Sequence, residues 1–234
     1  MTFTINPSKL SAFIRCKLKY AFGRWEIPAP PIESITLGSA VHTLLQEYYE
    51  KGIWNLDAIK DTEFDLSWFI SQYVSKANIG KVISVERKLE YPLSEDLTLN
   101  GRIDLTIRDM ADKVWVVDHK TTRRSPVAIT YAMSLQGIFY VWLSRQLGEP
   151  VDGAMYNVLV LDTARKKLEV QRYWLLYSQE QLNAFQTELM EWIKEVLEVE
   201  QKYILPKQLP RRTALYTCHE ECPWLEYCNK IYPW

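Results

Sequence analysis

Two segments decide the fold: Gly101-Arg102-Ile103-Asp104-Leu105 and Val114-Trp115-Val116-Val117-Asp118-His119-Lys120. Apolar residues alternate along the first segment, which predicts a β-strand with Asp104 on its polar face, because strand side chains switch sides at every residue. Asp118 and Lys120 share one face of the second segment for the same reason. The short Met110-Ala111-Asp112 stretch between the two segments predicts a hairpin loop.

The register of this hairpin predicts which residues face each other. If Asp109 pairs with Lys113, counting back along both strands places Asp104 directly opposite Asp118. Opposed residues bring their Cβ atoms to about 5 Å, where two like charges are destabilising. A divalent cation reverses that effect, since carboxylate oxygens are natural ligands of Mg²⁺ and Mn²⁺. We therefore expect a metal-dependent phosphodiesterase site, with Lys120 beside the metal as a fixed positive charge.

Composition bounds the class of protein. The chain has 234 residues, of which 47% are hydrophobic and 24% charged, as is typical of a folded globular protein. Its net charge of -1 gives no overall sign of nucleic-acid binding, although local basic runs such as residues 15–19 and 120–124 are candidates for phosphate contact. No apolar run approaches the roughly 20 residues that cross a membrane, and the N-terminus lacks a signal-peptide core. We expect a cytoplasmic protein with no membrane partner.

Hydrophobic periodicity predicts one α/β domain over residues 1–234. Helices are expected from Asn6-Pro7 to about Phe22, from Leu37 to Tyr48, and over residues 56–76, 130–147 and 178 onward. Ser178 and Gln181 form a capping box at the start of the last helix. Alternation predicts strands over residues 83–91, 154–161 and 168–176, in addition to the hairpin. Glu86 lies on the polar face of the first of these strands and could join the site, although we favour a solvated surface position.

Four motifs follow one another in a specific order. They are Gly38-Ser39-Ala40-Val41-His42 on a helix, Gly101-Arg102-Ile103-Asp104 on a strand, Asp118-His119-Lys120-Thr121 on the next strand, and Gln136 with Tyr140 on a helix. In this order they resemble the RecB-like branch of the PD-(D/E)xK nuclease superfamily, over about residues 8 to 230. The resemblance implies a restriction-endonuclease-like core, in which helices flank a central mixed sheet.

The resemblance also implies a metal site. Asp104, Asp118 and His42 would bind a divalent cation, with the backbone carbonyl of His119 as a further ligand. An imidazole ligand shifts the preference toward Mn²⁺ over Mg²⁺. The metal would lower the pKa of a bound water and neutralise charge on the scissile phosphate.

Three further residues would act beside the metal by the same resemblance. Lys120 would position the nucleophile or stabilise the charge that develops on the phosphate. Gln136 and Tyr140, four residues apart on one helix face, would orient the substrate backbone or Lys120.

The cysteines form a second group: Cys16 near the N-terminus, then Cys218, Cys222 and Cys228. One cysteine before the core and three after it resembles the iron-sulfur version of the same branch, found in AddB-type proteins and CRISPR adaptation nucleases, and implies a 4Fe-4S cluster. Three residues separate the first C-terminal pair, where the family often has two. Zinc on the same thiolates, with His219 as a substitute ligand, is the alternative. Either metal implies a structural staple, in which residues 8–24 and 206–234 form a cysteine-cluster appendage.

These features predict a DNA nuclease. We favour an exonuclease that acts on single-stranded DNA or duplex ends. The chain has no G-x-x-x-x-G-K-[ST] loop, so a helicase or recombination protein would be a separate partner. A non-cleaving DNA-binding module of the same fold and a structure- or site-specific endonuclease are the alternatives. The complete set His42, Asp104, Asp118 and Lys120 argues against the first, and the lack of a spare recognition segment against the second.

Overall fold

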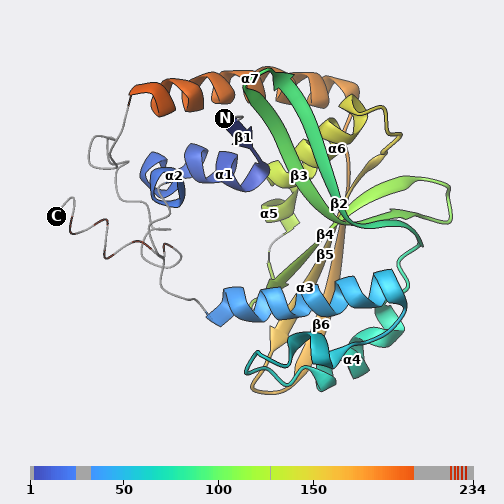
Figure 1. The fold of residues 1–234 in the computed structure, drawn as a ribbon. Helices are drawn as coiled ribbons and strands as arrows, with labels where there is room; N and C mark the ends of the chain where they lie inside the picture. Colours follow the sequence, from blue (N-terminus) through green and yellow to red (C-terminus); the bar gives the residue numbers. More distant parts are fainter. Residues whose placement is uncertain are drawn as a thin grey trace. The chain divides into compact units, whose positions relative to one another are not determined.

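The computed structural model describes residues 3–24, 33–126 and 128–202, together with residues 222, 224, 226, 228 and 230 (Figure 1). These residues divide into two compact units. The first unit contains residues 3–4 and 33–182, and the second contains residues 5–24, 183–202 and the described C-terminal positions. Residues 8–24 of the predicted appendage belong to the second unit, and most of its other segment, 206–234, lies outside the described residues.

A mixed β-sheet forms the centre of the first unit, and among the described residues it has six strands. The strands are β1 (Phe3–Ile5), β2 (Lys81–Ser94), β3 (Leu97–Arg108), β4 (Val114–Thr122), β5 (Gly153–Asp162) and β6 (Lys167–Leu176). Their order is β1-β3-β4-β5-β6, and β2 also pairs with β3. Only β4 and β5 are parallel among the pairs β2–β3, β3–β4, β4–β5 and β5–β6. The predicted α/β class with a mixed sheet is therefore confirmed.

The β3–β4 hairpin has the predicted register. The Asp109 N–H donates to the Lys113 carbonyl at 2.9 Å, and the pairing continues back to Leu105 opposite Val117. The Asp109 carboxylate holds the loop, because it accepts hydrogen bonds from the N–H groups of Ala111 and Lys113 at 2.8 and 2.9 Å. An Asp side chain that bonds to nearby backbone in this way favours a turn over a continued strand.

The helices of the first unit are α3 (Glu33–Lys51), η1 (Leu56–Ile59), α4 (Ser67–Tyr73), η2 (Val74–Lys76), α5 (Ala128–Ala132) and α6 (Leu135–Gln146). The prediction of one helix over residues 56–76 is wrong, because Asp65 accepts hydrogen bonds from the Ser67 N–H and hydroxyl at 3.1 and 2.6 Å and starts a new helix there. The prediction over residues 130–147 is wrong at Ser134, which has the extended backbone of an N-cap residue (φ -76°, ψ 124°).

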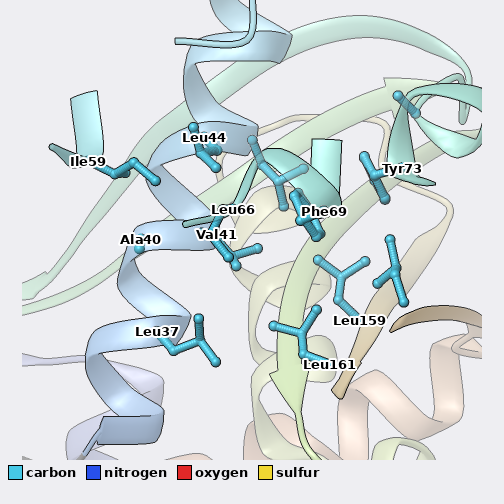
Figure 2. Packing of buried hydrophobic residues seen from close by; sticks show 13 residues of the cluster. Leu37, Ala40, Val41, Leu44, Ile59, Leu66, Phe69, Tyr73, Leu159 and Leu161 are labelled. Carbon is cyan, nitrogen blue, oxygen red and sulfur yellow. The ribbon is translucent and has the colours of Figure 1, made fainter. Parts of the chain in front are cut away.

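A hydrophobic cluster fixes α3 in place. Its members come from α3, η1, α4, β5 and β6 and from two residues that flank α4 and η2, and the labelled side chains point toward one another in Figure 2. Leu44 and Phe69 are fully buried there, and complete burial of such a side chain contributes about 1.5–3 kcal/mol. The apolar stripe of α3 thus faces this core and leaves His42 at its edge, with 34% of its side chain exposed.

Two helices cover β4 from opposite faces. A Cβ atom on Gly38 of α3 would lie 2.9 Å from the Thr121 hydroxyl oxygen, whereas Lys120 contacts Gln136 of α6. Since adjacent residues of a strand point to opposite faces, α3 and α6 lie on opposite sides of β4. The sheet is therefore flanked by helices, as predicted.

The second unit contains α1 (Pro7–Arg15), α2 (Lys17–Arg24) and most of α7 (Gln179–Lys202). Asn6 caps α1, as predicted, by accepting from the Lys9 N–H at 2.8 Å. The prediction of one continuous helix from Pro7 to about Phe22 is wrong, because the chain extends at Cys16 (φ -160°, ψ 111°). Tyr20 of α2 donates to Glu200 of α7 at 2.6 Å, which ties two segments far apart in sequence.

The predicted capping box of α7 is confirmed. The Gln181 side chain accepts from the Ser178 N–H at 2.9 Å, and the Ser178 hydroxyl accepts from the Gln181 N–H at 3.2 Å. Along the described residues, no helix combines the length and the apolar character that a membrane span needs.

Candidate active site

Asp104 of β3 and Asp118 of β4 lie just beyond the last backbone pair that these two strands form. The described pairing ends at Leu105 opposite Val117, and these two acids are the next residues in the same register. The His119 N–H instead donates to Asp104 Oδ2 at 2.8 Å. The Asp104 carboxylate thus bonds to the backbone of the neighbouring strand and holds its side chain next to Asp118.

Asp118 carries a buried oxygen without a hydrogen-bond donor. Its side chain is only 8% exposed, and Oδ2 accepts no hydrogen bond from the described residues. Lys120 Nζ lies 2.7 Å from this oxygen but outside the direction of a hydrogen bond, so the two form an ion pair by proximity alone. The ammonium group therefore offsets the charge of Asp118, but no donor of the described residues points at a lone pair of Oδ2, which leaves that lone pair open to a ligand.

The two carboxyls are electrostatically strained. Burial, and next the charge of Asp118, raise the pKa of Asp104 above its usual range. His42 Nδ1 lies 3.5 Å from Asp104 Oδ2. Burial lowers the pKa of His42 despite the nearby Asp118, so the ring favours its neutral form. A neutral imidazole and two carboxyl groups thus lie together, and each can donate an electron pair to a metal ion.

Lys120 is held by the helix that follows. Its ammonium group donates to Gln136 Oε1 at 2.7 Å, and Gln136 Nε2 donates to the Tyr140 hydroxyl at 3.2 Å. The ring of Tyr140 packs against Gly101, where a Cβ atom would lie 2.7 Å from the ring. The glycine of the first acidic motif therefore leaves room for the tyrosine of the α6 motif.

Comparison with known proteins agrees with this geometry. A model of the PD-(D/E)XK nuclease superfamily matches residues 4–229 of the chain. The chain belongs to this superfamily.

Solved structures resemble this PD-(D/E)XK nuclease in fold. A crystal structure from Eubacterium rectale, described as a "putative exonuclease", matches with a TM-score of 0.57 at 12% identity and covers 92% of this chain and 86% of that one. A crystal structure of the protein SSO0001 matches with a TM-score of 0.47 at 14% identity and covers 96% of this chain and 85% of that one. No curated protein matches the chain.

The site of this nuclease fits a divalent metal in its chemistry. PD-(D/E)XK nucleases generally use Mg²⁺ or Mn²⁺. Within the described ranges, no three His, Cys, Asp or Glu side chains are already gathered closely enough to hold a metal ion. Burial first, and the charge of Asp118 next, nevertheless disfavour the ionised form of Asp104, a cost that a bound cation would offset.

Glu86 lies next to the site, which is the less favoured of the two positions that we considered from sequence. The pairs Val85–Leu105 and Arg87–Ile103 flank it, so Glu86 faces Asp104 across the β2–β3 ladder. Its side chain is 19% exposed and forms an ion pair with Arg102 at 2.9 Å. Its backbone is left-handed (φ 48°), a conformation rare for a residue with a side chain. Glu86 is therefore half-buried beside the site and is not the solvated surface residue that we favoured from sequence.

Two polar residues next to the site were missed from sequence. Asn157 of β5 and Arg172 of β6 lie beside His119 in the sheet. Asn157 interrupts the apolar run from Ala154 to Leu161, and such a lone amide in a buried strand is the signal that could have indicated it.

The cysteine group lies only in part among the described residues. Cys16, Cys222 and Cys228 are half-buried, and Cys218 and His219 lie outside the described residues. Phe22 of α2 contacts Trp224, with 6.2 Å between ring centroids, so the C-terminal segment packs near the helix that follows Cys16. The iron-sulfur cluster and its zinc alternative stay predictions.

Proposed function

We propose that this PD-(D/E)XK nuclease is a metal-dependent deoxyribonuclease, and specifically an exonuclease on single-stranded DNA or duplex ends. The observation that carries the proposal is the buried Asp118 oxygen without a donor, next to Asp104, His42 and the ammonium group of Lys120. A purely structural ion pair would direct an ammonium hydrogen bond at that oxygen, whereas Lys120 directs its hydrogen bond at Gln136.

The ligands of the metal would be Asp104, Asp118, His42 and the His119 carbonyl. Bound there, Mg²⁺ or Mn²⁺ supplies a more acidic water and neutralises charge on the scissile phosphate. Neutral His42 can offer a ring nitrogen, which favours Mn²⁺. The paired carboxyls would hold the cation, and Asp104 is itself held by the His119 N–H at 2.8 Å.

Lys120 supplies a second positive charge for the phosphate. Gln136 holds its ammonium group at 2.7 Å, and Tyr140 in turn accepts from Gln136 at 3.2 Å. A cation fixed in advance stabilises developing charge without reorganisation, and loss of one such group typically slows a reaction by about 10²–10³-fold. Gln136 and Tyr140 thus orient Lys120, although a contact with the DNA backbone is also compatible with their place.

The choice of exonuclease rests on the lack of a spare recognition segment in the sequence. The Eubacterium rectale structure shares the fold, and its described activity is consistent with this choice. These 234 residues contain no phosphate-binding motor loop, and a separate helicase or recombination partner stays a prediction. The cytoplasmic location stays a prediction.

An end-labelled digestion series tests the function. Linear single strands, linear duplexes and closed circles of both kinds are incubated with the purified chain in Mg²⁺, in Mn²⁺ or in EDTA. We expect metal-dependent shortening of the linear substrates and survival of the circles. Cut circles would show an endonuclease, and DNA that is bound in a gel-shift assay but not cut would show a binding module.

We also propose a 4Fe-4S cluster on Cys16, Cys218, Cys222 and Cys228, with a structural role. The support is the arrangement of one cysteine before the core and three after it, together with the contact between Phe22 and Trp224. Protein purified without oxygen should be brown, with broad visible absorbance that bleaches on oxidation. A colourless protein with one zinc ion per chain would establish the zinc alternative.

A further inference from the structure

A row of polar residues crosses the sheet behind the active site. His119 of β4 pairs with Asn157 of β5, and Asn157 pairs with Arg172 of β6, so the three side chains stand side by side. Asn157 is fully buried, and His119 is 3% exposed. Buried polar side chains in adjacent strands are costly unless every donor and acceptor has a partner.

Arg172 fixes the orientation of the Asn157 amide. A guanidinium group only donates, so the Asn157 atom that accepts from Arg172 Nε at 3.2 Å is the oxygen. The amide nitrogen therefore faces the other way, where it lies 2.8 Å from the Tyr73 hydroxyl and 3.0 Å from His119 Nδ1. Arg172 also donates to the Lys76 carbonyl, which anchors the guanidinium group at the end of η2.

Each remaining hydrogen bond of the network has one possible donor. Tyr49 donates to the Ala77 carbonyl at 2.7 Å, so the 3.1 Å contact between the Tyr49 and Tyr73 hydroxyls has Tyr73 as its donor. Tyr73 is then free to accept from the Asn157 amide. Both protons of that amide are used, and the second one must go to His119 Nδ1. The network thus defines one proton arrangement, with His119 Nδ1 as an acceptor.

The His119 ring is held on two sides. Asn157 donates to its edge, and the Tyr49 ring stacks on its face with 5.7 Å between centroids and 8° between planes. The same residue provides the N–H that binds Asp104 at 2.8 Å, and His42 hydrogen-bonds the His119 backbone. A ring held on two sides restricts the backbone of its own residue, and that backbone contacts two of the proposed metal ligands, Asp104 and His42.

We propose that Asn157 and Arg172 are positioning residues that set the His119 peptide, and with it the affinity of the site for a divalent metal. The proposal rests on the proposed function, because it takes Asp104, Asp118, His42 and the His119 carbonyl as the ligands. Partners that orient metal ligands in this way typically change metal affinity or activity by about 10–100-fold when they are removed.

Two substitutions test the network through Mn²⁺ binding in the absence of DNA, measured by electron paramagnetic resonance of the free ion. Arg172→Met removes the group that orients the amide, and Asn157→Asp keeps an acceptor for Arg172 but removes both donors. We expect each to raise the dissociation constant for Mn²⁺ by about 10-fold or more. Arg165→Met is the matched control, since this arginine is 83% exposed in its side chain and pairs with Asp162 at the surface; its Mn²⁺ affinity should equal that of the unsubstituted protein.

Unchanged Mn²⁺ affinity in both variants would overturn the proposal, even if their thermal stability fell, because lower stability alone would mean a purely structural network. If neither variant folds, the tautomer of His119 in the unsubstituted protein tests the network instead. Nitrogen-15 shifts of His119 in the unsubstituted protein should show an unprotonated Nδ1 and a protonated Nε2, and a protonated Nδ1 would overturn the network. Mn²⁺ binding without DNA cleavage would reject only the proposed function, whereas a protein that binds no Mn²⁺ would reject both.

Discussion

The two compact units of the chain differ in what they bury. Every buried polar residue identified in the described part of the chain belongs to the first unit: Thr106, Asp118, His119, Ser144 and Asn157. The described part of the second unit buries apolar stripes such as Leu10, Phe13 and Leu18, and its charges pair at the surface, as Lys17 does with Glu195 at 3.1 Å. A folded domain tolerates buried polar groups at a cost in stability, so their concentration in one unit marks where chemistry is expected.

The largest expected effect is at Asp118. Asp118→Ala removes the unsatisfied oxygen and a ligand of the proposed metal, so DNA cleavage in Mn²⁺ should fall by about 10³-fold or more. The circular-dichroism spectrum should be unchanged. Glu169→Ala, which removes an exposed acid from β6 of the same unit, is the control and should cleave normally. Undiminished cleavage by Asp118→Ala would contradict the site assignment.

A pair of glycine substitutions compares the two units directly. In Gly101→Ala the new Cβ would lie 2.7 Å from the Tyr140 ring, which must shift and take Gln136 with it. Displacement of positioning groups by about 1 Å can cost about 10²-fold in rate, so we expect cleavage to fall by that order.

The matching substitution in the second unit should be harmless. Gly23 lies in α2, and nothing approaches within 4 Å of the position that its Cβ would take. Gly23→Ala should therefore leave cleavage unchanged and stabilise the helix by up to about 1 kcal/mol, as thermal unfolding would report. Equal loss of activity in both alanine variants would mean that Tyr140 has no special role.

A cysteine substitution in the second unit should lower stability and leave the cleavage rate nearly unchanged, the opposite of what we expect at the active site. If Cys222 is a ligand of a structural cluster, Cys222→Ala should lower the free energy of unfolding by about 2 kcal/mol, the range typical of a lost metal ligand or core contact. The cleavage rate per folded molecule should change little. Chemical denaturation and active-site titration of the same preparation separate the two quantities. A large loss of rate with unchanged stability would instead indicate a catalytic or redox role.

The positions of all strands except β1 were predictable from sequence, and the hairpin register was too. Alternation assigns each residue of β3 and β4 to a face, and a hairpin loop at Met110–Asp112 pairs Asp109 with Lys113, as the structure has it. Helix interruptions at Cys16 and Ser134 were not predictable, because the apolar spacing continues across both. Periodicity reports which side of a segment is buried, but not whether its backbone is continuous.

The site was predictable only where its residues belong to linear motifs. Asp104, Asp118, Lys120 and Gln136 each lie within a short pattern, and the structure brings them together. The ladder of His119, Asn157 and Arg172 spans three strands, and the register between β4 and β5 depends on a crossover through α5 and α6. No local pattern specifies that register, so the polar row becomes visible only in the fold.

The smallest expected effect concerns stability and the charge of Asp104. Burial and the charge of Asp118 raise the pKa of this carboxyl, so its ionised form is disfavoured in the folded protein. A carboxyl whose pKa is raised by folding makes its full contribution to stability below its usual pKa of about 3.9, and loses it as the pH rises toward the raised value. Without metal, Asp104→Asn should therefore unfold at a temperature about 2–4 °C higher near neutral pH, which corresponds to about 1 kcal/mol.

This gain should shrink as the pH falls toward about 4, where the unsubstituted carboxyl is protonated in both states. Saturating Mn²⁺ should reverse the order, because only the unsubstituted protein gains the full binding energy of the cation. Thermal unfolding at several pH values, with and without Mn²⁺, measures both effects. A destabilised Asp104→Asn protein in the absence of metal would mean that the two carboxyls do not repel each other. The charges of the buried polar groups in the first unit would then be balanced as well as those of the surface ion pairs in the second unit.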